Sequence, residues 1–95
     1  MSDEPRRAGE LPAIDFSTFV LSISTTALYQ MGLVDDPETG QRAAPDTLLA
    51  RQTIDTLEML REKTRGNLDE DETKLFDSLL YELRMRFVEL ESSGS

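Results

Sequence analysis

Apolar side chains recur at every third or fourth position in three separate segments of the chain, the repeat of one helix face. The pattern predicts helices over residues 16–31, 47–65 and 70–90. Only a few residues separate the second segment from the third, and such short connections join antiparallel neighbours. We therefore predict an all-α, three-helix domain whose second and third helices form an antiparallel hairpin, completed by dimerisation.

The first predicted helix is the segment around which the chain is organised, because residues 16–34 contain no charged side chain. A helix on the surface of a monomer ordinarily carries charged residues on its outer side. Leu21 and Leu28 lie off the main apolar face, which consists of Phe16, Phe19, Val20, Ile23, Ala27, Gln30 and Met31. We therefore expect the helix to be covered on more than one side.

Lipid is a poor candidate for this cover. The uncharged segment reaches the length of a short membrane span, about 17–25 residues, but it is rich in Ser and Thr and lacks flanking Lys or Arg anchors. Small hydroxyl residues favour close contact between helices, with each hydroxyl bonded to the carbonyl four residues earlier. Contact with protein is the better interpretation.

The second and third predicted helices each have an apolar face. The buried face of the second consists of Ala50, Thr53, Ile54, Leu57 and either Leu60 or Arg61. The stripe of the third consists of Phe76, Leu79, Leu80, Leu83, Phe87 and Leu90. Opposite this stripe lie Tyr81, Met85 and Val88, a row that could contact a second subunit.

Residues typical of helix boundaries accompany each segment. The expected N-terminal caps, which accept hydrogen bonds from free backbone amides, are Asp15 or Ser17, Asp46 or Thr47, and Asp69 with Glu72 in a capping box. Gly32 and Gly66 are the expected helix stops. We predict one helical domain over residues 14–90, between a flexible arm at 1–13 and a disordered tail at 91–95.

Composition excludes several functions. Ten basic and 19 acidic residues give a net charge of −9, which repels nucleic acids and anionic membranes. Without cysteine the chain has no disulfide or thiolate chemistry, and without a recognisable leader we expect a cytoplasmic location. Without histidine as well, the commonest groups for proton transfer and nucleophilic catalysis are missing.

The remaining candidates for chemistry are carboxylates. Asp55, Glu58 and Glu62 share one side of the second helix, but a di-metal carboxylate bundle also needs a Glu-x-x-His motif. The turn that begins at Asp36 lacks the alternating ligands of a calcium loop. We therefore predict no catalytic, cofactor-binding or metal residues, and no enzymatic activity.

The leading hypothesis is a self-associating interaction module, most simply a homodimer that buries the uncharged helix. Its candidate interface comprises Phe16, Phe19, Val20, Leu21, Ile23, Ser24, Leu28, Met31, Tyr81, Met85 and Val88. One alternative is a monomeric adaptor that covers the same helix with another protein. The other is a small-ligand binder or enzyme that uses the hydroxyl-lined first helix.

Several short segments together resemble DUF1844, a small bacterial family of unknown function. They are DFSTF from Asp15, DPETG from Asp36, IDTLEML from Ile54, KTRGNL from Lys63 and LYELR from Leu80. The resemblance covers about residues 14–90. It implies a bacterial, cytoplasmic setting and brings no reaction or ligand with it.

Overall fold

A computed structural model describes residues 14–93 of the chain. Three helices make up its regular structure: α1 (Phe16–Gln30), α2 (Thr47–Lys63) and α3 (Glu70–Ser93). The described residues contain no strand, and each helix packs against the other two. The all-α, three-helix prediction is confirmed, whereas the arm expected at residues 1–13 lies outside the described residues.

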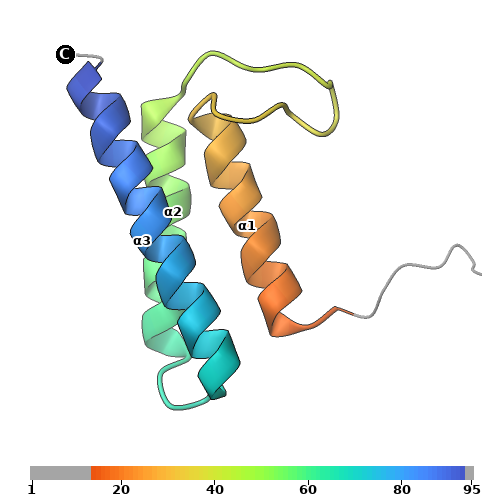
Figure 1. The fold of residues 1–95 in the computed structure, drawn as a ribbon, viewed down its shortest axis with the longest axis vertical. Helices are drawn as coiled ribbons and strands as arrows, with labels where there is room; N and C mark the ends of the chain where they lie inside the picture. Colours follow the sequence, from red (N-terminus) through yellow and green to blue (C-terminus); the bar gives the residue numbers. More distant parts are fainter. Residues whose placement is uncertain (1–13, 94–95) are drawn as a thin grey trace, which may run out of the picture.

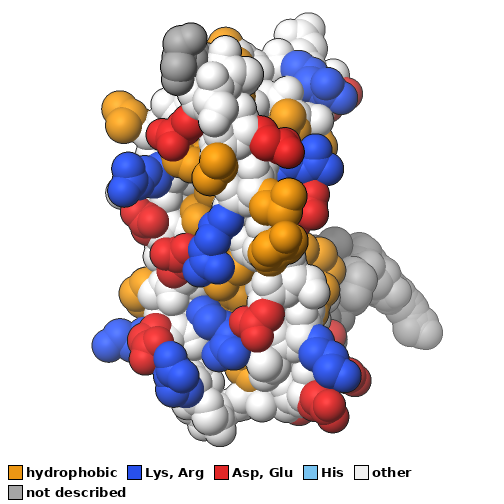
Figure 2. Space-filling view, turned by 60° about the vertical axis from the view of Figure 1, so that its left-hand side comes forward, with side chains coloured by type: hydrophobic (Ala, Val, Ile, Leu, Met, Phe, Trp, Pro, Cys, Tyr) orange, Lys and Arg blue, Asp and Glu red, His pale blue; other side chains and the backbone are white. Residues whose placement is uncertain are grey.

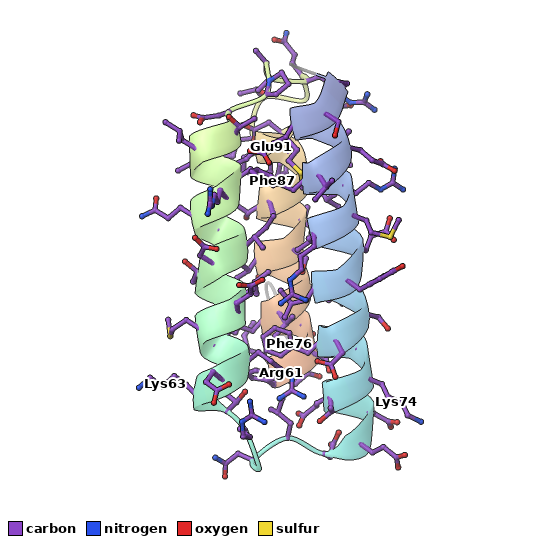
Figure 3. All side chains as sticks on the ribbon, turned by 90° about the vertical axis from the view of Figure 1, so that its left-hand side faces the viewer. Arg61, Lys63, Lys74, Phe76, Phe87 and Glu91 are labelled. Atoms are coloured by element: carbon purple, nitrogen blue, oxygen red, sulfur yellow. The ribbon has the colours of Figure 1, made fainter. Side chains whose placement is uncertain are left out.

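The helices lie side by side along one common direction (Figure 1). A short connection joins α2 to α3 at one end of the bundle, and a longer connection joins α1 to α2 at the other end. Seen from the side that α2 and α3 share, α1 lies behind these two helices (Figure 3). Each helix therefore has an inner side, which faces the other two, and an outer side.

The three helices begin where the capping residues predict. Asp15 Oδ1 accepts a hydrogen bond from the Thr18 amide at 2.8 Å, and Asp46 Oδ1 accepts one from the Leu49 amide at 3.1 Å. At the start of α3 the capping box is complete. The Glu72 amide donates to Asp69 Oδ1 at 2.8 Å, and the Asp69 amide donates to Glu72 Oε1 at 3.0 Å. These bonds satisfy amides that have no partner within the helix.

The helix ends differ from expectation by one to three residues. α1 ends at Gln30 and α2 at Lys63, slightly before the predicted positions. α3 continues to Ser93, so residues 91–93 are helical and the predicted tail over them is wrong. The physical reason is that residues 91–93 include neither glycine nor proline, the two residues least favourable in a helix interior.

The core lies along the common axis of the three helices. Figure 3 shows Phe76 and Phe87 pointing into the space between the helices, whereas Lys63 and Lys74 point away from it. The Phe76 ring is fully buried, 5.8 Å from the ring of Phe16 between centroids. The buried apolar side chains are Val20, Ala27, Met31, Ala50, Ile54, Leu57, Phe76, Leu80 and Leu83.

The buried face of α1 differs from the predicted face by a rotation about the helix axis. Val20, Ala27 and Met31 are buried as predicted, but Phe19 is 43% exposed and Ser24 is buried in its place. An α-helix has 3.6 residues per turn, so Phe19, five residues before Ser24, lies about 140° round the helix from it. A buried face that includes Ser24 therefore leaves Phe19 exposed. Ser24 and Ala27 on α1 and Ala50 on α2 are small buried side chains, and small side chains allow packed helices to lie closer together.

The connection between α1 and α2 is held by its own hydrogen bonds. The Glu38 amide donates to Asp36 Oδ1 at 2.8 Å, and the Gly40 amide donates to the Asp36 carbonyl at 2.7 Å, as expected for the predicted turn. The Asp46 amide donates to the Gln30 carbonyl at 2.8 Å, so the cap of α2 rests on the end of α1. The connection thereby fixes where α2 begins relative to α1.

Gly32 is the position in this connection where a larger residue should do most harm. Its φ is +76°, and an added Cβ would lie 3.0 Å from the Ala43 carbonyl oxygen. Left-handed backbone costs L-residues about 1–2 kcal/mol, and here a clash adds to that cost. We expect Gly32→Ala to lower the free energy of unfolding in urea by more than this amount.

Gly66 supplies the matched control. Its φ is +83°, but nothing lies within 4 Å of an added Cβ, so Gly66→Ala has the backbone cost without the clash. Equal losses for the two variants would show that the contact with Ala43 does not matter.

Candidate interaction surface

The outer side of α1 is exposed and uncharged. Phe19 and Leu21 are 43% and 45% exposed. The side chains between them around the helix are the small hydroxyls Thr18, Ser22 and Thr25, followed one turn later by the half-buried Tyr29. We call this surface the α1 outer face and define it as Thr18, Phe19, Leu21, Ser22 and Thr25. In the single chain this face contacts solvent, although its sequence has the composition of a covered helix.

The hydroxyl groups of α1 are hydrogen-bonded to the helix itself. Thr25 Oγ1 donates to the Leu21 carbonyl at 3.0 Å, and Ser24 Oγ donates to the Val20 carbonyl at 2.9 Å. Ser22 Oγ donates to the Phe19 carbonyl at 2.8 Å, three residues back instead of four. The predicted bonding to the preceding turn is therefore present, and these side chains present mainly their carbon atoms to a neighbour.

Several predicted interface residues belong instead to the core of the single chain. Val20, Ser24 and Met31 are buried, with 2% or less of their surface exposed. The half-buried Phe16, Ile23 and Leu28 pack against the same core. Val20, Ser24 and Met31 are therefore covered within the single chain, and the contact of the other candidate interface residues with a second chain stays a prediction.

A second apolar surface lies on the outer side of α3. Tyr81, Met85 and Val88 are 64%, 43% and 60% exposed, whereas Leu80 and Leu83 on the opposite side are buried. We call these three residues the α3 row. They line a shallow depression of about 400 Å³ together with Arg84 and Glu89.

Two charged residues line the depression with the α3 row, one of each sign. Arg84 Nε donates to Glu58 Oε2 on α2, whereas Glu89 makes no ion pair within residues 14–93. Figure 2 shows hydrophobic side chains lying between basic and acidic ones on this side of the molecule. The surroundings of the row are thus polar, but close to neutral.

A further ion pair joins α2 to α3 near their short connection. Arg61 Nε donates to Asp77 Oδ1 at 2.8 Å. The hydrogen bond from Arg61 holds the pKa of the Asp77 carboxyl below its ordinary value of 3.8. Both side chains are partly exposed, so the pair stabilises the fold only modestly.

This pair predicts a small acid-dependent loss of stability. A carboxyl whose pKa is lower in the folded chain stabilises the fold above its unfolded pKa, and this stabilisation disappears as pH falls through the folded pKa. We expect the loss below about pH 4. The free energy of unfolding is measured in urea at pH values from 6 to 3. Between these values it should decrease less for Asp77→Asn than for the wild type. Asp55→Asn is the control, since Asp55 makes no ion pair within residues 14–93.

Sequence reasoning missed some surface and core features. Leu48 and Met59 on α2 are well exposed although neither was assigned to an interface. In the interior, Thr53 Oγ1 donates to Gln30 Oε1 at 2.7 Å and links α2 to α1. This hydrogen bond could have been predicted, because Thr53 and Gln30 are polar residues on the predicted buried faces of the two helices.

The described part of the chain offers little for other kinds of site. Within residues 14–93, no group of three or more acidic side chains is arranged to hold a metal ion. No helix of this part is both long and apolar enough to cross a membrane.

A family model described as a domain of unknown function, DUF1844, matches residues 13–89. Neither the curated proteins nor the solved structures contain a match to the chain.

Proposed function

Since the chain belongs to the DUF1844 family, whose function is unknown, we propose its role from its surface: a non-enzymatic protein–protein interaction module that self-associates. Two copies form the smallest assembly, and the α1 outer face is buried in the contact. The observation that carries this proposal is an exposed, uncharged helix face on a chain with a net charge of −9. The proposed setting is the bacterial cytoplasm.

Hydrogen bonding supports burial of this face. A polar group that loses water without gaining a partner costs about 1–3 kcal/mol in proteins. The Ser22 and Thr25 hydroxyls already donate to carbonyls of α1, so a neighbouring chain does not need to supply acceptors for them. The apolar surface of Phe19 and Leu21 then favours association.

Charge supports α1 as the point of contact between copies. Two chains of net charge −9 repel each other, most strongly where acidic side chains would meet. The repulsion is weakest where α1, which has no charged residue, lies between the chains. Because added salt screens repulsion, self-association should become tighter from low to moderate ionic strength.

Substitution of Leu21 tests the proposal directly. Leu21→Glu places a charge on the α1 outer face at a position that is 45% exposed, so the single chain should stay folded while self-association is lost. Sedimentation velocity at several concentrations and two salt concentrations measures the association. The matched control is Leu48→Glu on α2, at a position that is 83% exposed and outside the proposed contact.

Two outcomes would contradict self-association. One is a wild-type chain that remains monomeric at tens of micromolar, and the other is equal association of wild type and Leu21→Glu. A wild-type monomer that loses binding to a different protein on Leu21→Glu substitution would support the adaptor alternative.

A further inference from the structure

We propose that the α1 outer face of one chain packs on the α3 row of a second copy, in a head-to-tail contact. This inference rests on the proposed self-association and names the surface that the second copy contributes. The α3 row is exposed in the single chain, and its three side chains are large. Like the α1 outer face, the α3 row is therefore a surface that only a partner can cover.

The two surfaces have complementary shapes. The middle of the α1 outer face is formed by the small side chains Thr18, Ser22 and Thr25, which are spaced four and three residues apart. The large side chains of the α3 row have the same spacing of four and three residues. With a rise of about 1.5 Å per residue, successive positions match along the two helices. A ridge of large side chains can then lie along a row of small ones, as in ordinary helix packing.

Charge selects the same pair of surfaces. Arg84, the basic residue that lines the depression with the α3 row, already has a partner in Glu58. An occupant with its own charges would compete with this pair, whereas an uncharged occupant leaves it intact. Of the three helices, α1 is the one without a charged residue. The uncharged face of a second copy therefore fits the row better than α2 or α3 of that copy would.

A symmetric contact between two α1 helices satisfies these surfaces less well. Along the middle of the face it would place small hydroxyl side chains against small hydroxyl side chains, and the large Phe19 and Leu21 lie only at the two edges of that face. It would also leave Tyr81, Met85 and Val88 exposed in the assembly. The head-to-tail contact covers both surfaces with one interface.

The arrangement has a consequence for assembly size. Both surfaces lie on outer sides of different helices, so one chain does not cover its own row with its own α1. Each head-to-tail dimer keeps one free α1 outer face and one free α3 row. Such contacts add further copies unless rotation closes a ring. The mean mass should therefore increase with protein and salt concentration beyond that of a dimer.

A mixing experiment tests the inference. Leu21→Glu blocks the α1 outer face and keeps the α3 row, whereas Met85→Glu blocks the row and keeps the α1 outer face. Each variant alone should sediment as a monomer, and an equimolar mixture should form a one-to-one dimer that does not grow with concentration. Both substitutions introduce Glu, so the mixture gains no new attraction between opposite charges. Circular dichroism verifies that both variants fold. A second mixture, of the single variants Leu21→Ser and Met85→Ser, repeats the experiment without added charge.

The outcomes separate the two proposals. If Met85→Glu alone associates as wild type does while Leu21→Glu is monomeric, the head-to-tail inference is overturned and self-association through α1 stands. A mixture that stays monomeric while wild type associates also overturns the inference. A wild-type chain that never associates overturns both proposals.

Discussion

Phe76→Ala should cost the fold more than truncation of any other aromatic residue. The Phe76 side chain is fully buried and contacts the ring of Phe16 from α1, so its removal leaves a cavity where α1 and α3 meet. Truncations of this kind cost about 3–5 kcal/mol, against a total stability of about 5–15 kcal/mol for ordinary domains. Urea unfolding followed by circular dichroism would measure the loss.

Phe19→Ala is the control for this truncation. It removes the same number of atoms from a side chain that is 43% exposed, so the cavity term is small and the loss should be well below that of Phe76→Ala. Similar losses for both variants would mean that the core is not organised around Phe76.

Ser24→Leu should be the second most damaging substitution. Ser24 is 2% exposed on the inner side of α1, where the side chain is covered by the rest of the bundle. A larger side chain there forces the helices apart or into strained rotamers, at a cost of about 1–3 kcal/mol. The shift in the urea midpoint at constant slope would report this loss.

Ser24→Ala distinguishes size from hydrogen bonding at this position. Its hydroxyl donates to the Val20 carbonyl. This carbonyl lies within the helix, where a backbone amide donates to it whether or not the hydroxyl is present. Removing the hydroxyl therefore leaves no buried donor unpaired, and we expect a change of at most about 1 kcal/mol. A large loss for Ser24→Ala would show that the hydroxyl itself holds α1 in place.

The sequence allowed correct prediction of features that depend on neighbouring residues. The caps at Asp15, Asp46 and Asp69 form as predicted. The ion pairs of Lys74 with Glu70 and of Arg86 with Glu82 each join residues four apart on α3, and the spacing along one helix is enough to bring such residues together. Local geometry decides both kinds of contact.

Contacts between helices were harder to predict. Whether Phe19 or Ser24 faces the core depends on how α1 is rotated about its axis, and packing against α2 and α3 decides this. The pairs Arg61–Asp77 and Arg84–Glu58 depend on how α2 and α3 are aligned, which no spacing along either helix specifies. The candidate interface contained buried residues for the same reason: a charge-free helix does not reveal which of its sides the chain itself covers.

The internally bonded hydroxyls of α1 have a consequence for the kinetics of assembly. Because the Ser22 and Thr25 side chains keep the same hydrogen-bond acceptors in water and in a contact, the helix requires little rearrangement before it binds. Preorganised surfaces lose less conformational entropy on association. In the proposed assembly, copies would therefore join and separate as rigid bodies, and exchange between free and assembled chains should be rapid compared with unfolding.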